Sequence, residues 1–222
     1  MATRLRIDFV SDIVCPWCAV GLASLTQALE RMRGELEVDI HVQPFELDPN
    51  MPADGMEVAG NLKRKYGMSD AQLEENQARI RERGAELGFT FDFNARSRTW
   101  NTFDAHRLLH WAATQGDGFQ LALKRALLVA NFTDGRNIAD HAVLAEVAGS
   151  VGLDMARANE VLAAARYADE VRAAQKFFRD LGIQSVPAVI IERRHLVSGG
   201  QPQEVFEQAL RQVAAQKAAT AT

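Results

Sequence analysis

The chain has 222 residues and a formal net charge of −4, which gives it no general attraction to nucleic acid. Hydrophobic residues make up 47% and charged residues 24%, a balance that is ordinary for globular proteins and excludes disordered and fibrous classes. The first residues lack the apolar core of a signal peptide and no apolar run approaches membrane-spanning length, so we expect a cytoplasmic protein with no membrane partner.

The first part of the chain has a strand–helix–strand pattern. Apolar and charged residues alternate over residues 5–9, which predicts a half-buried strand that runs into a Cys-Pro-Trp-Cys motif at residues 15–18. Apolar residues then recur at three- and four-residue steps up to Gly34, so a helix is predicted to begin at the cysteines. Renewed alternation over residues 37–42 predicts a second strand.

The middle of the chain is predicted to be a helical block, because it has several helix signals and no convincing period-two stretch. A capping box at residues 69–72 begins one predicted helix, whose apolar stripe ends at Gly88. A break near Tyr167 marks the point where the chain is predicted to return to the sheet. The remaining helical segments are predicted at residues 103–114, 119–130, 141–151 and 154–181.

The last part of the chain predicts a hairpin followed by a final helix. Two short apolar runs at residues 188–191 and 195–198 are separated by a three-residue turn.

Together the elements predict an α/β protein with a thioredoxin fold and a large all-helical domain inserted between the second strand and the second thioredoxin helix. The predicted boundaries are residues 1–50 for the first part of the thioredoxin domain, 51–167 for the insertion and 168–222 for the second part.

Cys15 and Cys18 are the two cysteines of the sequence, and their C-x-x-C spacing points to redox exchange or metal binding. Pro16 suits the first helical position, which leaves Cys15 near the helix cap, where unpaired N–H groups and the helix dipole favour a thiolate. Cys15 is therefore predicted to be an exposed catalytic nucleophile, and Cys18, one turn further in, the resolving thiol. This chemistry requires no metal and no cofactor beyond the Cys15–Cys18 disulfide.

Two alternatives exist for the cysteine pair. One is half of a zinc site, and the other is a pair of small buried side chains with no chemistry. Structural zinc normally takes four ligands, and the histidines offer no second closely spaced pair that would complete them. The placement of C-x-x-C between a strand and a helix favours redox exchange. The histidines concerned are His41, His106, His110, His141 and His195.

Four motifs carry a resemblance to a known family: SDIVCPWC at 11–18, NTFDAHRL at 101–108, VPA at 186–188 and SGGQP at 198–202. The sequence resembles the cytosolic FrnE-like branch of the DsbA thiol–disulfide oxidoreductases, in the thioredoxin superfamily. The resemblance implies a cis peptide bond before Pro187, beside Cys15, and a Val186 backbone that pairs with an extended disulfide substrate. Pro16 and Trp17 complete the predicted substrate-binding residues. Trp17 is interpreted as a lid over the thiols, a platform for the substrate or a packing residue.

Two acidic residues precede the cysteines. Asp8 falls where the resemblance places an acidic residue under the active-site helix, which makes it a candidate proton acceptor for Cys18. Strand alternation places Asp8 on the face of Arg6, so the alternative is an ion pair with Arg6 or exposure to solvent. Asp12 adds a negative charge that opposes a thiolate at Cys15 if it turns towards the sulfur, and this predicts a reductant or isomerase more than a strong oxidant.

Asn101 and His106 belong to a stretch that faces the site in the resembled family, and no role is assigned to either residue. His106 is expected to be partly buried and hydrogen-bonded rather than catalytic.

The pattern as a whole predicts a thiol–disulfide oxidoreductase or isomerase that exchanges disulfides through its dithiol. Its expected partner is a protein, peptide or small molecule that carries a thiol or a disulfide, with glutathione as a candidate co-substrate. The alternative is a glutathione-dependent isomerase or transferase of the kappa or 2-hydroxychromene-2-carboxylate isomerase type, which shares this architecture but uses a single Ser or Cys. A binding module without catalysis is a third interpretation. The presence of both cysteines favours exchange.

Overall fold

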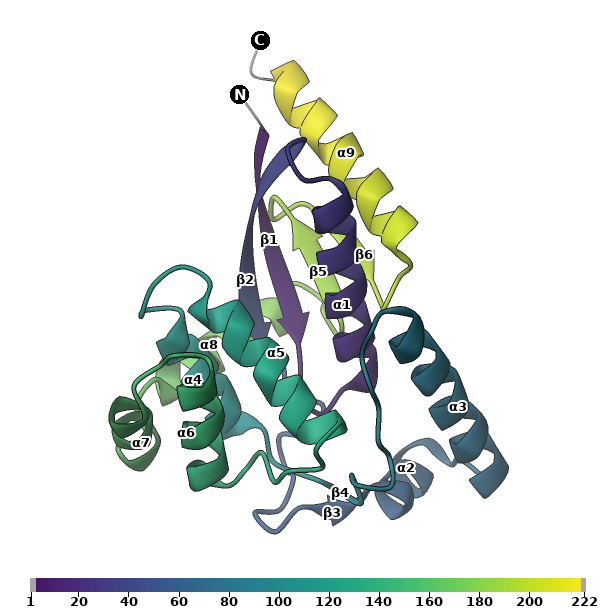
Figure 1. The fold of residues 1–222 in the computed structure, drawn as a ribbon, viewed down its shortest axis with the longest axis vertical. Helices are drawn as coiled ribbons and strands as arrows, with labels where there is room; N and C mark the ends of the chain where they lie inside the picture. The colour runs from purple at the N-terminus through teal and green to yellow at the C-terminus, as the bar shows by residue number, and fades with distance from the viewer. Residues whose placement is uncertain (1–2, 221–222) are drawn as a thin grey trace.

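The computed structural model describes residues 3–220, and its first three elements form the predicted strand–helix–strand unit (Figure 1). The elements are β1 (Thr3–Ser11), α1 (Pro16–Arg31) and β2 (Leu36–Pro44). β1 and β2 are parallel along their whole length, with Ile7 opposite Ile40. The connection places the start of α1 just after the end of β1, which is where the two cysteines lie.

The last four elements complete one four-stranded sheet with the strand order β2-β1-β5-β6. They are α8 (Ala168–Asp180), β5 (Ala188–Ile191), β6 (His195–Ser198) and α9 (Gln203–Thr220). β5 is antiparallel to both β1 and β6, so the predicted hairpin is present. Its turn holds Glu192 and Arg193 in the left-handed conformation, with φ angles of 52° and 56°.

Strand alternation decides which helices cover which face of the sheet. Ile7 and Phe9 point to the face that α1 and α9 cover, and both are fully buried. Val10 and Ile190 point to the opposite face, where Phe178 of α8 packs against them. Burying each of these side chains contributes roughly 1.5–3 kcal/mol, so packing on both faces stabilises the sheet.

The segment between β2 and α8 is largely helical, as predicted (Figure 1). Its elements are β3 (Met56–Glu57), α2 (Val58–Tyr66), α3 (Asp70–Glu86), β4 (Arg98–Thr99), α4 (Phe103–Ala112), α5 (Phe119–Phe132), α6 (His141–Ser150) and α7 (Met155–Ala163). The capping box is confirmed, because Ser69 accepts the N–H of Gln72 while the Gln72 side chain accepts the N–H of Ser69. The predicted break at Tyr167 is also present and separates α7 from α8.

The sequence did not predict α2 or the ladder of β3 with β4, so the insertion is helical but not all-helical. Each of the two strands has two residues, and alternation cannot be recognised over that length. α2 has nine residues and its last turn is basic over residues 63–65, so few apolar positions mark it as a helix. Its start is nevertheless encoded locally, because the Glu57 side chain accepts the N–H groups of Ala59 and Gly60.

α5 joins the insertion to the sheet and α1. Leu128 and Phe132 pack into the core that α1 shares with the sheet, whereas Leu123 and Leu127 pack into a second core with α4, α6 and α7. One helix therefore carries side chains into both cores, which holds the insertion against α1. No helix in the described part of the chain combines the length and apolar character needed to cross a membrane.

Candidate active site

The Cys-Pro-Trp-Cys motif occupies the start of α1, as predicted. Cys15 is the N-cap residue, with extended φ and ψ angles of −88° and 111°, and Pro16 is the first helical residue. The Cys18 N–H donates to the Cys15 carbonyl at 3.0 Å and closes the first turn. Pro16 removes no hydrogen bond at this position, because the first helical N–H groups have no partner within the helix.

Cys15 is more enclosed than the sequence suggested. It is 5% exposed rather than open to solvent, while Cys18 is 0% exposed. The difference from the expectation arises because residues of the insertion lie over the start of α1 and form a pocket there. Cys15 lines this pocket, so it remains the more accessible of the two thiols.

The loop before β5 lies against the Cys15 sulfur. The peptide bond between Val186 and Pro187 is cis, as the resemblance implied. The Cys15 thiol donates a hydrogen bond to the Val186 carbonyl at 3.6 Å, so the two segments are in contact although 171 residues separate them. Gly21 of α1 allows the approach of this loop, because a Cβ atom at Gly21 would lie 3.0 Å from the Pro187 Cγ.

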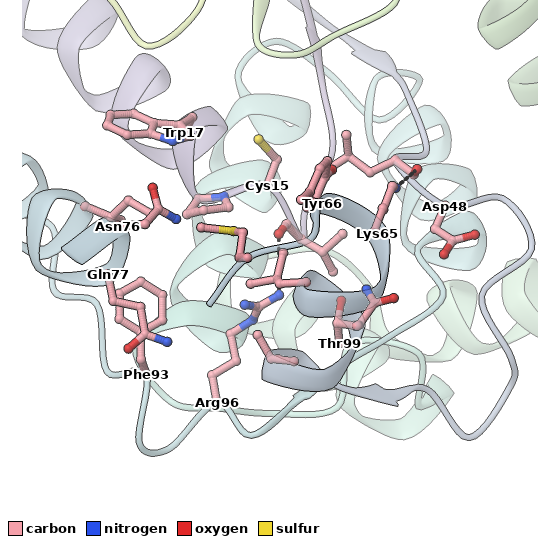
Figure 2. Close-up of a pocket in the computed structure, with 18 of the residues that line it drawn as sticks. Cys15, Trp17, Asp48, Lys65, Tyr66, Asn76, Gln77, Phe93, Arg96 and Thr99 are labelled. Carbon is pink, nitrogen blue, oxygen red and sulfur yellow. Dashed lines mark hydrogen bonds between the residues drawn. The ribbon is translucent and has the colours of Figure 1, made fainter. Parts of the chain in front are cut away.

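A pocket of about 330 Å³ lies between the start of α1 and the helices α2 and α3 of the insertion (Figure 2). Cys15 and Trp17 lie at one side of it, and Arg96 and Thr99 lie at the other. Trp17 also packs against the core around α1, so it is both a pocket residue and a packing residue. The rest of the lining is mixed, and includes the apolar side chains Met51, Leu62, Tyr66, Ile80 and Phe93 and the polar side chains Asp48, Asn61, Lys65, Asn76 and Gln77.

Asp8 does not lie beneath α1, which corrects its assignment as a proton acceptor for Cys18. Its carboxylate accepts hydrogen bonds from Arg6 at 2.6 Å and from Gln43 at 2.7 Å. Side chains alternate along β1, and Ile7 faces α1, so Asp8 faces the other side of the sheet. Of the two alternatives that strand alternation left open, the ion pair with Arg6 is the arrangement present.

Asp12 holds the chain that leads to the cysteines. Its two carboxylate oxygens accept the N–H of Ile13 at 2.7 Å and the N–H of Leu47 at 2.8 Å. His106 lies 3.4 Å from the carboxylate and 3.0 Å from the Phe45 carbonyl, so it is buried and hydrogen-bonded, as expected. Burial would raise the pKa of Asp12, but the hydrogen bond and charge of His106 and the Leu47 N–H together hold it below its ordinary value.

Two buried side chains of the insertion hold the next two residues of this loop. Asn131 donates to the Ile13 carbonyl at 3.1 Å. Arg96 donates to the Val14 carbonyl at 3.4 Å and to Asn131 at 3.3 Å. Burial lowers the pKa of Arg96 to about 10, while the charge of Cys15 acts in the opposite direction. Arg96 is therefore still a cation near neutral pH, on the wall of the pocket that Cys15 also lines (Figure 2).

Sequence reasoning missed Arg96, Asn131 and a third buried polar residue, Lys124. Lys124 is fully buried on α5, and its charge interacts with Cys18. A signal was available for Asn131 and Lys124, because each is a polar residue on a helix face whose neighbours at three- and four-residue spacing are apolar. Arg96 had no such signal, since it lies outside any helix or strand.

Asn101 fixes the start of α4 against the pocket wall. Its side chain donates to the Met51 carbonyl at 3.3 Å and accepts the N–H of Phe103 at 2.9 Å. Met51 lines the pocket, so Asn101 holds part of the pocket wall in position. Within residues 3–220, no three His, Cys, Asp or Glu side chains lie close enough together to hold a metal ion.

A four-stranded sheet of this order, with a C-x-x-C motif at the start of its first helix and a proline loop against the first cysteine, defines a thioredoxin-fold protein with a helical insertion. The chain belongs to the family described as the DSBA-like thioredoxin domain, whose model matches residues 6–211. It is therefore a DsbA-like oxidoreductase of a family that acts on thiols and disulfides.

Solved structures of related proteins share the fold over nearly the whole chain. A probable DsbA oxidoreductase from Streptomyces coelicolor is 40% identical, with a TM-score of 0.86 and coverage of 94% of this chain and 89% of that one. The cytosolic disulfide reductase DsbM from Pseudomonas aeruginosa, solved with GSH, is 19% identical, with a TM-score of 0.66 and coverage of 93% and 98%. A 2-hydroxychromene-2-carboxylate isomerase is 14% identical, with a TM-score of 0.71 and coverage of 98% and 100%. The last two likenesses concern the fold alone.

Proposed function

We propose that the chain catalyses dithiol–disulfide exchange, as a disulfide oxidoreductase or isomerase, with Cys15 as the attacking thiol and Cys18 as the resolving thiol. The observation that carries the proposal is the position of Cys15. It lies at the N-terminus of α1, on the pocket wall and against the Val186 carbonyl. Cys18 lies one turn deeper and is fully buried, which suits a thiol that reacts only with its neighbour.

In the proposed cycle the Cys15 thiolate attacks one sulfur of a substrate disulfide, and the other substrate sulfur leaves as a thiolate. The first N–H groups of α1 and the helix dipole stabilise the negative charge on Cys15 before the attack. Cys18 then attacks the Cys15 sulfur of the mixed disulfide, which forms the Cys15–Cys18 bond and releases the second substrate thiol. The reverse sequence oxidises a substrate dithiol, so both directions use the same residues.

Val186 is proposed to align the substrate beside Cys15. Its carbonyl accepts the Cys15 thiol at 3.6 Å in the reduced protein, and it becomes available to a substrate N–H once Cys15 has lost its proton. Pro187 adds no N–H donor of its own at this point of the chain. Pro16, Trp17 and Val186 line the same pocket as Cys15, and Pro187 follows Val186 in the chain.

The pocket supports a peptide, a small disulfide or the exposed cysteine loop of a protein as the substrate. A volume of about 330 Å³ accepts a few residues but no folded domain. Lys65 and Arg96 supply cations, and Asn76 and Gln77 supply amides, a set that suits carboxylates and peptide groups. Glutathione carries carboxylates, peptide groups and a thiol, so we propose it as a co-substrate. No cofactor is proposed beyond the redox-active Cys15–Cys18 disulfide.

The proposal places the chain in the cytosolic FrnE-like branch of its family. A reducing compartment keeps thiols reduced, so net reduction or isomerisation of disulfides suits a cytoplasmic location better than net oxidation does.

A thiol trap tests the proposed function. Cys18→Ala protein mixed with a cell lysate should accumulate mixed disulfides at Cys15, because nothing resolves them, and Cys15→Ser should accumulate none. With purified protein, bis(nitrobenzoic acid) disulfide should release two coloured thiolates per reduced wild-type molecule and one per Cys18→Ser molecule. The proposal fails if Cys15→Ser, which keeps only the Cys18 thiol, releases one thiolate at the rate of the wild-type first phase.

The second candidate function is a glutathione-dependent isomerase or transferase, and the likeness in fold to 2-hydroxychromene-2-carboxylate isomerase favours it. Such chemistry needs one nucleophile at the position of Cys15 and makes no use of Cys18. Cys18→Ser should then keep full glutathione-dependent turnover, whereas disulfide exchange should stop after the first thiolate. Glutathione bound non-covalently beside unmodified thiols would favour this second function.

A further inference from the structure

Lys124 of α5 is 0% exposed, and its Nζ atom has no hydrogen-bond partner among residues 3–220. A buried ammonium group without a hydrogen-bond partner is strongly unfavourable. An apolar side chain of similar length would fill the same volume without this penalty. The lysine is therefore poorly explained by packing, and its location indicates a role in the chemistry of the site.

The geometry of α5 places Lys124 on the helix face that packs against α1. Leu121 and Leu128 lie three and four residues away, so they share a face with Lys124, and both pack against the core around α1. The next residue, Arg125, donates to Thr26 of α1 at 2.9 Å, which shows that the two helices are in direct contact. Lys124 thus lies at the contact between α5 and the helix that carries the cysteines.

The charges that act on Lys124 come from the active site. They belong to Cys18, Asp12 and Cys15, and Cys18 makes the largest contribution of the three. Asp12 is already engaged by two backbone N–H groups and by His106. Cys18 is therefore the group whose proton Lys124 is best placed to receive.

We propose that Lys124 accepts the proton of Cys18 in the resolving step, an inference that rests on the exchange proposed for Cys15 and Cys18. Burial raises the pKa of Cys18 well above its ordinary value, and a hydrogen bond to Cys15 adds to the effect. Burial lowers the pKa of Lys124. Proton transfer from the buried thiol to the buried amine converts two neutral groups into a thiolate and an ammonium that stabilise each other.

The transfer fits the order of events in the cycle. Once Cys15 is joined to the substrate, its sulfur carries no charge, and neutral Lys124 takes the proton of Cys18. The Cys18 thiolate attacks the Cys15 sulfur, which forms the Cys15–Cys18 bond and breaks the bond from Cys15 to the substrate sulfur. The substrate sulfur leaves with the bonding electron pair and takes up one proton as Lys124 releases one. The protein dithiol is oxidised, and the substrate disulfide is reduced to two thiols.

A two-phase measurement tests this role. Reduced full-length protein is mixed rapidly with bis(nitrobenzoic acid) disulfide, and the two coloured thiolates report the attack of Cys15 and the resolution by Cys18 separately. Lys124→Met keeps the length of the side chain and removes the amine. We expect its second phase to be roughly 10²-fold slower than that of the wild type near neutral pH. Its rate should rise about tenfold per pH unit, because it then follows the fraction of Cys18 thiolate, and the wild-type rate should rise less steeply.

Arg125→Met is the matched control, because it removes a cation from the next residue of α5, which is exposed and bound to Thr26. It should keep the second phase of the wild type. The charges of Cys15 and Asp12 also act on Lys124, and the charges of His106 and Arg96 interact with Asp12. Because some of these groups titrate, variant and wild type are always compared at the same pH.

A Lys124→Met second phase with the rate and pH dependence of the wild type would overturn the inference and leave the exchange chemistry intact. Release of one thiolate by Cys15→Ser at the rate of the wild-type first phase would instead overturn the proposed function on which the inference rests. If circular dichroism shows that Lys124→Met does not fold, Lys124→Gln serves the same two-phase measurement with a neutral polar side chain.

Discussion

The Asp12 carboxylate and the His106 imidazole form a buried pair, with Oδ1 3.4 Å from Nε2. His106 belongs to α4 of the insertion, whereas Asp12 begins the loop that leads to Cys15. The two residues after Asp12 are held in a similar way by Asn131 and Arg96. Three side chains of the insertion therefore fix three consecutive residues of this loop, so the insertion positions the proposed nucleophile as well as forming the pocket.

Replacing Asp12 with Asn should lower the free energy of unfolding by about 1–3 kcal/mol, because an amide N–H would face the backbone N–H of Ile13 or Leu47. The pKa of Asp12 is held below its ordinary value in the fold. Its stabilising contribution is therefore present above the pKa of the unfolded chain and is lost as the pH falls through the folded pKa. Urea unfolding at several pH values should show the difference between variant and wild type shrinking in acid.

The same variant tests whether Asp12 sets the redox poise. Because its carboxylate is engaged by backbone N–H groups and His106, we expect Asp12→Asn to change the reduction potential of the dithiol little. Equilibration with glutathione measures that potential. A clear rise in potential would support the earlier interpretation, in which the Asp12 charge opposes the Cys15 thiolate.

Arg96→Met should slow the first thiolate release on the order of tenfold, because it removes a cation that interacts with Cys15 and the hydrogen bond to Val14. Stopped-flow absorbance measures this phase. Arg98→Met is the matched control, since the Arg98 guanidinium binds the Asp54 carbonyl at 2.6 Å and does not contact the cysteine loop. Equal first phases in the two variants would show that Arg96 has only a structural role.

Gly21→Val should lower the free energy of unfolding by about 1–3 kcal/mol and slow exchange, because even a Cβ atom at Gly21 lies 3.0 Å from Pro187. The added side chain should push the proline loop away from the Cys15 sulfur. Ala23→Val places a similar side chain on α1 beside Leu128, away from this loop, and is the control. Chemical denaturation and the rate of the first thiolate release are measured for both variants. Equal losses of stability and of rate would argue against a particular role for the close contact between Gly21 and Pro187.

Lys124→Met should raise the free energy of unfolding near neutral pH by about 1–4 kcal/mol, because it removes a buried amine that has no hydrogen-bond partner in the described chain. The pKa of Lys124 is lowered in the fold, so the folded chain binds this proton less tightly than the unfolded chain does. The free energy of unfolding of the wild type therefore rises as the pH increases from the folded to the unfolded pKa of the lysine. The extra stability of the variant over the wild type should shrink over the same pH range. Guanidinium denaturation at several pH values checks this. A variant less stable than the wild type at every pH would contradict it.

The sequence by itself determined the elements whose signals lie among neighbouring residues. Alternation over residues 5–9, the proline that starts α1 and the capping box at Ser69 were all readable, because helical and turn hydrogen bonds join residues close in the chain. The position of the two cysteines at a helix start followed from the same local signals. The two-residue strands β3 and β4 lacked such a signal, since only their pairing across the insertion defines them.

Only the tertiary structure decided which side chains surround the two sulfurs. Arg96 lies 82 residues from Val14, and Asn131 lies 118 residues from Ile13, yet both hold the loop before Cys15. The tertiary structure also enclosed Cys15 and placed Lys124 at the contact between α5 and α1. No local pattern encodes these contacts, because they depend on how the insertion packs across α1. Burial of apolar surface drives that packing. Because the hydrophobic effect is non-directional, the positions of the helices are fixed only when the whole core forms.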